Sequence, residues 1–198
     1  MDDVYHNENF LPSELFSDLN ATMLKRYRVH KGVANSQKPT INNIELNELD
    51  DYSLFSPDLS AANVNYYLSL RVGVPGLKTV RFLRDAITNE FNMSNPVFGN
   101  AWFIYFTNKD SCGWHIDRNI ANIPDSVPEN SYTFCLYTHA AWEDSWGGKY
   151  QTKLQQYSVK PNTLIGCRRS IEHSITPITH NNPELLRMVF VSSWKVDT

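Results

Sequence analysis

The spacing of apolar residues in the first half of the chain predicts two helices. From Leu11 the stretch LPSELFSDLNATMLK has apolar side chains at helical spacing, and Ser13 can cap its first turn. The stretch PGLKTVRFLRDAITNEFN begins at Pro75 and has a narrow apolar stripe opposite a polar face. This stripe consists of Leu77, Val80, Leu83, Ile87 and Phe91. Between Val33 and Ser60 the chain is polar without a clear period, so we expect a loop there, with a short strand near Thr40–Ile44.

After Pro96 the pattern changes to short runs of β-branched and aromatic residues, separated by turn-forming clusters. Runs of this kind predict the strands of an antiparallel sandwich or barrel. We expect strands over Ala101–Thr107, Tyr132–Thr138, Lys149–Thr152, Tyr157–Val159, Thr163–Cys167, Ile171–Ile178 and Leu185–Trp194. We expect Gly147 and Gly148 to form a turn or bulge where a strand begins, because glycine adopts such backbone geometry at little cost.

Length, composition and charge narrow the class of protein. The 198 residues are enough for one domain with a substantial core, and no glycine- or proline-rich break divides them. Hydrophobic residues make up 41% and aromatic residues 13% of the chain, which favours a sheet-rich core over a disordered chain. The net charge of −3 and the scattered Lys and Arg residues argue against a nucleic-acid-binding face.

Neither a membrane protein nor a disulfide-stabilised protein is indicated. The acidic start MDDVYHNENF has no apolar signal region, and no run of about eighteen apolar residues occurs, so we expect a cytoplasmic protein without membrane contact. Cys112, Cys135 and Cys167 are odd in number and lack CxxC spacing, so we expect buried reduced thiols instead of disulfides or a structural zinc site.

The stretch GWHIDRN places His115 and Asp117 two residues apart, a spacing that lets both side chains reach one ion from a strand and its following turn. His173 is the best third ligand, because it lies inside the strand-like SIEHSITPI. Two histidines and one carboxylate form the facial triad of non-haem Fe(II) oxygenases, with open positions on the metal. Zinc can use the same three ligands, so ligand type alone does not decide the metal.

An arginine in the apolar run LLRMVFVSSW is a second unusual feature. A buried guanidinium needs an anion, and its planar fork suits a carboxylate. The alternatives are an internal salt bridge and an exposed strand edge. Arg187 is therefore a candidate for binding a ligand carboxylate.

Taken together, these residues resemble the Fe(II)- and 2-oxoglutarate-dependent oxygenases, closest to their prolyl-4-hydroxylase-like branch. WHID is similar to the His-x-Asp motif of that family, and WEDSWGGKY to its tryptophan and Gly-Gly step into a strand. VKPNTLIGCRRSIEHSITPI is similar to the segment that runs to the distal histidine, and RMVFVSSW to the closing strand with its arginine. The four elements occur in the family's order over about 101–194, roughly half of the chain.

The resemblance implies a mostly β fold of the α+β type. This fold is a double-stranded β-helix, a jelly-roll or cupin-like barrel with N-terminal helices packed on one outer face. It implies a single oxygenase domain over 1–198, with a helical and loop support region over 1–95 and the barrel with its metal site over 96–198.

The resemblance also implies a reaction and roles for five residues. His115, Asp117 and His173 would bind Fe(II), and Arg187 would pair with the distal carboxylate of 2-oxoglutarate. Tyr105 would donate a hydrogen bond to this cosubstrate, the alternative being a plain core aromatic. Molecular oxygen would oxidise the cosubstrate to succinate and carbon dioxide while a substrate C–H bond is hydroxylated.

The substrate is the least determined part of the prediction. Trp114, Arg118, Asn119 and Trp142 would lie near the mouth of the barrel, where Arg118 suits a carboxylate or phosphate. A compact chain without an appended module favours a small molecule such as a free amino acid or a derivative, and a peptidyl proline is the alternative within the family. The remaining alternatives are a zinc-dependent cupin-like enzyme and a non-catalytic jelly roll that binds sugar or peptide.

Overall fold

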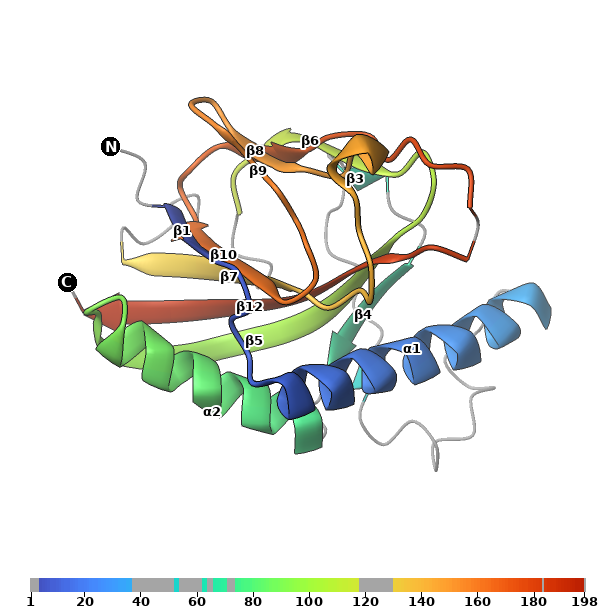
Figure 1. Cartoon of the computed structure of the whole chain (residues 1–198). Helices are drawn as coiled ribbons and strands as arrows, with labels where there is room; N and C mark the ends of the chain where they lie inside the picture. The colour runs from blue at the N-terminus through green and yellow to red at the C-terminus, as the bar shows by residue number, and fades with distance from the viewer. Residues whose placement is uncertain are drawn as a thin grey trace.

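The computed structural model describes residues 4–36, 52–53, 62–63, 66–70, 74–117, 130–182 and 184–197. In this part of the chain two antiparallel sheets face each other, and two helices lie on the outer side of the larger sheet (Figure 1). The fold is thus mostly β with helices on one outer face, as predicted. No described helix is long and apolar enough to cross a membrane.

The helices are α1 (Ser13–Ser36) and α2 (Val74–Asn89). Both predicted helices are confirmed, and α1 continues beyond the stretch that had a clear apolar period. Leu83 and Ile87 of the predicted α2 stripe are buried, and Val80 and Phe91 pack against the same core. The amphipathic pattern therefore identified the face that α2 presents to the sheet.

The larger sheet contains seven strands, in spatial order β1 (Val4–Asn7), β10 (Thr163–Arg168), β7 (Ser131–Tyr137), β12 (Arg187–Asp197), β5 (Ser94–Phe106), β4 (Tyr66–Leu70) and β2 (Tyr52–Ser53). The smaller sheet contains five, in the order β3 (Ala62–Asn63), β6 (Ser111–His115), β11 (His173–Ile175), β8 (Tyr150–Thr152) and β9 (Gln156–Tyr157).

Each of the seven predicted runs overlaps a strand, although the ends differ and the run Tyr157–Val159 shares only Tyr157 with β9. β5 begins at Ser94 and β12 continues to Asp197, because these two strands pair with each other along most of their length. The run predicted over Ile171–Ile178 holds only the short β11 and an isolated bridge at Ile178. Five strands were not predicted, namely β1, β2, β3, β4 and β6, and β2 lies in the stretch that was expected to be a loop. The strand expected near 40–44 lies outside the described residues.

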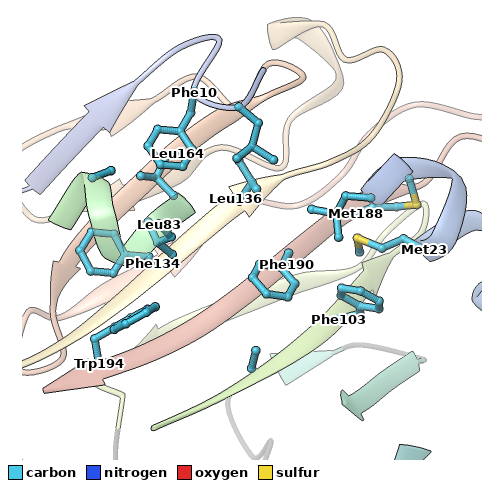
Figure 2. Packing of buried hydrophobic residues seen from close by; sticks show 14 of the residues in the cluster. Phe10, Met23, Leu83, Phe103, Phe134, Leu136, Leu164, Met188, Phe190 and Trp194 are labelled. Atoms are coloured by element: carbon cyan, nitrogen blue, oxygen red, sulfur yellow. The ribbon is translucent and has the colours of Figure 1, made fainter. Parts of the chain in front are cut away.

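Both faces of the larger sheet are apolar, and each face has its own core. Alternate residues of β12 point to opposite sides, so Phe190 faces the helices whereas Val189 and Val191 face the smaller sheet. Figure 2 shows the helix-side cluster, in which Met23 of α1 lies beside side chains of the strands. The second cluster fills the interior between the two sheets, where the candidate site lies.

The predicted glycine turn is confirmed. Gly147 and Gly148 follow the 3-10 helix η3 (Asp144–Trp146) and have φ angles of +73° and +65°, in the left-handed region that favours glycine. A Cβ atom at Gly147 would lie 2.1 Å from the carbonyl oxygen of Pro177, so no larger residue fits this turn unchanged. The three cysteines are free, as predicted.

Candidate metal centre

Two neighbouring strands of the smaller sheet bring the predicted triad together. His115 is the last residue of β6 and His173 the first of β11, and the two residues are directly opposite each other in the antiparallel pairing. Their rings lie on the same side, with centroids 4.3 Å apart. Asp117 follows β6 by two residues, and its backbone N–H donates a hydrogen bond of 3.0 Å to the carbonyl oxygen of Arg169.

The ligand atoms of the triad converge on one point. They all lie within 4.8 Å of one another. Among the described residues, this is the one group of three or more His, Cys, Asp or Glu side chains that could hold a metal ion. Asp117 Oδ1 is 3.7 Å from His115 Nε2 and 3.8 Å from His173 Nε2. These distances are too long for good hydrogen bonds and leave room for an ion between the three atoms.

Backbone carbonyl groups fix the protonation pattern of both histidines. Nδ1 of His115 lies 2.8 Å from the oxygen of Gly113, and Nδ1 of His173 lies 2.9 Å from that of Ile171. A carbonyl oxygen only accepts, so each Nδ1 carries a proton, and in the neutral form of each ring Nε2 is the nitrogen with the free lone pair. Histidine ligands of metals are usually held in this way by a second hydrogen bond.

The electrostatics also suit a divalent metal. Burial lowers the pKa of His173, which keeps this imidazole neutral. Burial raises the pKa of Asp117, but His173, Thr133, His115 and Arg169 together outweigh it, and the net pKa is lowered. Its Oδ2 atom is buried without a hydrogen-bond partner. Two imidazoles and one carboxylate with an unpaired buried oxygen fit Fe(II), and equally zinc.

Arg187 lies in the same interior, on the larger sheet. It is 1% exposed, and its guanidinium is 4.6 Å from the ring centroid of Phe106 and 4.7 Å from that of Tyr137. Nη2 donates a hydrogen bond of 3.1 Å to the Tyr137 hydroxyl, whereas Nε has no partner. No carboxylate of the described residues lies within 4.0 Å of it, so the alternative of an internal salt bridge is not found there.

Two thiols connect the triad with the arginine. Burial is the largest influence on the pKa of both Cys112 and Cys135 and raises it. In addition, the Asp117 carboxylate raises and the Arg187 guanidinium lowers the pKa of each thiol. The side chains in contact with Arg187, Phe106 and Tyr137, belong to the same buried cluster as Cys112 and Tyr150, which contact His115 and His173, so the triad and Arg187 face one interior.

The structure contradicts the predicted role of Tyr105. This tyrosine is fully buried on the helix side of the larger sheet, where its hydroxyl donates a hydrogen bond of 2.9 Å to the carbonyl oxygen of Met23 in α1. Tyr105 is paired with Met188, and the neighbouring pair Phe106 and Arg187 faces the interior. The prediction chose the wrong strand face, and Tyr137 of β7 is the tyrosine beside Arg187.

A second tyrosine that was not predicted supports the triad. The ring of Tyr150 stacks on the His173 imidazole, with centroids 5.0 Å apart and planes 20° apart. Its hydroxyl is 2.9 Å from Cys167 Sγ. Tyr137 and Tyr150 both lie in predicted strands, but nothing in the sequence indicated that their side chains face the site.

The predicted substrate residues have different positions. Trp114, next to His115, is 42% exposed, and Lys153 Nζ lies 3.8 Å from its ring centroid. Trp142 is 7% exposed, donates its indole N–H to the carbonyl oxygen of Gly147 at 3.0 Å and packs in the interior core, so its predicted contact with substrate is replaced by a packing role. Arg118 and Asn119 lie outside the described residues.

Comparison with solved structures gives an independent view of the fold. A prolyl-4-hydroxylase from Pseudomonas putida matches with a TM-score of 0.59 and 12% identity, over 100% of this chain and 94% of the other. A Trichoplax adhaerens prolyl hydroxylase, solved with a hypoxia inducible factor peptide, gives 0.60 and 13%, over 100% and 84%. HygX from Streptomyces hygroscopicus, solved with nickel and 2-oxoglutarate, gives 0.60 and 6%, over 98% and 83%.

Sequence comparison adds nothing to these structural matches. No family model matches the chain, and no curated relative matches it by sequence. The chain therefore has the fold of solved prolyl hydroxylases and of a protein that binds 2-oxoglutarate, which confirms the family resemblance at the level of fold.

Proposed function

We propose that this protein is an Fe(II)- and 2-oxoglutarate-dependent dioxygenase that hydroxylates an unactivated C–H bond. One observation carries the proposal. A convergent His-Asp-His triad with free Nε2 atoms shares an interior with a buried arginine that has no carboxylate partner among the described residues. A metal and a dicarboxylate would satisfy the two unpaired ends of this site together.

Each end of the interior would bind one part of the cosubstrate complex. His115, Asp117 and His173 would hold Fe(II), which, when bound with 2-oxoglutarate and oxygen, supplies the oxidising power for hydroxylation. The Arg187 guanidinium and the Tyr137 hydroxyl would hold the distal carboxylate of 2-oxoglutarate through charge-assisted hydrogen bonds. The apolar side chains that line the interior exclude water, which strengthens these contacts.

We also infer that 1–198 form a single oxygenase domain, with 1–95 as support and 96–198 as a double-stranded β-helix. The two facing antiparallel sheets and the placement of the triad on the smaller sheet support this assignment. Matches that extend over 98–100% of the chain support it as well.

For the substrate we propose a small molecule such as a free amino acid or a derivative. The exposed ring of Trp114 next to His115 is available to contact it, and Arg118 and Asn119 remain proposed contacts. The alternative is a peptidyl proline, favoured by the similarity to two prolyl hydroxylases, one of them solved with a peptide. Screening free amino acids against proline-containing peptides for stimulated turnover decides between them.

Succinate formation tests the reaction class. Succinate should appear from 2-oxoglutarate only with Fe(II) and oxygen, and Asp117→Ala should abolish it. Asp144→Ala, which removes an exposed carboxylate of η3, should leave it unchanged. Iron-independent turnover, or tight zinc binding without binding of 2-oxoglutarate, would instead favour the zinc-dependent alternative.

A further inference from the structure

The glycine turn before β8 lies directly against the arginine of the candidate site. Gly148 N–H donates a hydrogen bond of 3.3 Å to the carbonyl oxygen of Pro177, and Gly147 accepts one of 3.0 Å from the indole of Trp142. Gly147 also forms an isolated β-bridge with Ile178. The turn is thus held from two sides and cannot easily move away from Arg187.

A side chain at position 148 would collide with Arg187 in the middle of its length. A Cβ atom there would lie 2.9 Å from Arg187 Cδ, 3.1 Å from Trp142 Cζ2 and 3.2 Å from Ile178 Cγ1. Trp142 and Ile178 are themselves buried in the interior core and have little room to yield. The remaining response is a shift of the Arg187 side chain.

Such a shift would reach the end of the side chain that binds the ligand. The guanidinium lies against the rings of Phe106 and Tyr137, and its Nη2 bonds the Tyr137 hydroxyl. Displacement of Cδ therefore moves the charged head relative to both rings and to that hydroxyl. Hydrogen bonds to charged groups weaken steeply when their geometry is lost.

We infer that Gly148 is a positioning residue for the cosubstrate: because it has no side chain, Arg187 can place its guanidinium where the distal carboxylate of 2-oxoglutarate binds. This inference rests on the proposed function. None of the three atoms nearest to a Cβ atom at position 148 belongs to a metal ligand, so Gly148 should act through Arg187. Its effect should therefore be confined to ligands that carry a distal carboxylate.

Binding calorimetry on the anaerobic, Fe(II)-loaded protein tests this role with two probes. 2-Oxoglutarate has a distal carboxylate, whereas 2-oxopentanoate has a methyl group in its place and the same group at the metal end. In the natural protein 2-oxoglutarate should bind more tightly by about tenfold or more, which measures the contact with Arg187. In Gly148→Ala this ratio of the two Kd values should fall towards one.

The ratio separates positioning from general damage. Alanine at φ +65° is strained wherever it occurs, and strain alone would weaken both acids equally. Ile87→Val, a mild change in the helix-side core, is the matched destabilised control and should keep the natural ratio. Should Gly148→Ala fail to fold, Phe106→Leu removes one ring from the guanidinium and should lower the same ratio.

The outcomes distinguish this inference from the function on which it rests. An unchanged ratio in a folded Gly148→Ala protein overturns the positioning role and leaves the proposed function intact. If Gly148→Ala does not fold, an unchanged ratio in Phe106→Leu shows that the ratio does not depend on the position of the guanidinium, which overturns the positioning role as well. A natural protein that binds neither acid in the presence of Fe(II) overturns the proposed function and this inference with it.

Discussion

The guanidinium of Arg187 is the clearest sign of a ligand at the scale of single residues. It is buried against two aromatic rings, and its Nη2 donates one hydrogen bond to the Tyr137 hydroxyl. Removing a charge from water is costly unless an opposite charge replaces the lost hydration. A carboxylate that reaches this position would therefore be bound strongly.

Replacing the arginine should separate cosubstrate binding from folding. Arg187→Gln should raise the KM for 2-oxoglutarate by about thirtyfold or more, because an unpaired buried carboxylate costs roughly 2–5 kcal/mol. Succinate assays over a range of 2-oxoglutarate concentrations measure this, and circular dichroism checks the fold. Arg84→Gln, an exposed arginine of α2, is the control. An unchanged KM would show that Arg187 does not bind the cosubstrate.

Two buried tyrosines on opposite faces of the larger sheet offer a matched pair of variants. Tyr137→Phe removes the hydroxyl beside Arg187 and should raise the KM for 2-oxoglutarate about tenfold, as expected for a hydrogen bond to a charged group. Tyr105→Phe removes a hydroxyl bonded to α1 and should lower stability without changing that KM. A raised KM in Tyr105→Phe and an unchanged KM in Tyr137→Phe would instead place the cosubstrate on the helix side of the larger sheet.

Stability in mild acid should report on His139. Burial, with a smaller contribution from Arg187, lowers the pKa of this imidazole to about 3. In the unfolded chain the pKa of a histidine is about 6.5. Below that pH the unfolded state binds more protons, so the free energy of unfolding falls as pH decreases, by about 1.4 kcal/mol per pH unit for one histidine. The stabilising effect is thus complete above about pH 6.5 and is lost on acidification.

Urea unfolding between pH 7 and pH 5 measures this effect. His139→Gln should flatten the dependence of unfolding free energy on pH, although the lowered pKa of His173 leaves part of the slope. His6→Gln, on an exposed position of β1, is the control. A slope that is the same in His139→Gln and the natural protein would refute the assignment.

At the scale of elements, one asparagine joins the N-terminal segment to the barrel. Asn162 has φ +59°, and its side chain accepts a hydrogen bond of 2.9 Å from Leu11 N–H and donates one of 2.8 Å to the Leu11 carbonyl oxygen. Its backbone N–H donates to the carbonyl oxygen of Tyr137 at 2.8 Å. This turn therefore fixes the start of α1 against β7 and β10.

Loss of this side chain should weaken the whole fold. Asn162→Ala should lower the free energy of unfolding by about 2–4 kcal/mol, from two lost buried hydrogen bonds and a left-handed backbone. Asn162→Gly should lose less, because glycine relieves the backbone strain. Asn92→Ala, at an exposed position with φ +53°, is the control for strain alone. Equal free energies of unfolding in urea for Asn162→Ala and the natural protein would contradict the proposed role of this side chain.

The sequence predicted the elements that have a clear local pattern. It missed strands that form because they pair with strands distant in the sequence. α2 and β12 have strong patterns of their own and were predicted. β6, with the sequence SCGWH, has no alternation and exists because it pairs with β11 and β3. β1 is a four-residue edge strand that, among the described strands, pairs with β10. Such strands are specified by tertiary pairing, which a local pattern does not contain.

The candidate site shows the same limit. The spacing of His115 and Asp117 and the rigid position of His173 predicted which residues come together. The prediction that Tyr105 binds the cosubstrate failed because both faces of the larger sheet are apolar, so the pattern does not reveal which residues point inward.

At the scale of the whole molecule, the larger sheet lies between the helices and the interior that contains the candidate site. Helices α1 and α2 lie on one side of it and the smaller sheet on the other (Figure 1). Its helix side carries a continuous apolar core, and Arg187 lies on its other side, against Phe106 and Tyr137 of the core between the sheets. The triad and Arg187 therefore belong to different sheets. A ligand that binds both ends connects the two sheets and should stabilise the folded protein, as any ligand of the native state does.

Anaerobic titration with Fe(II) and 2-oxoglutarate tests this arrangement most directly. The account predicts a weak visible charge-transfer band that appears only when both are present, and that is lost in Asp117→Ala at the same concentrations. The absence of a band in the natural protein with saturating Fe(II) and 2-oxoglutarate would contradict it.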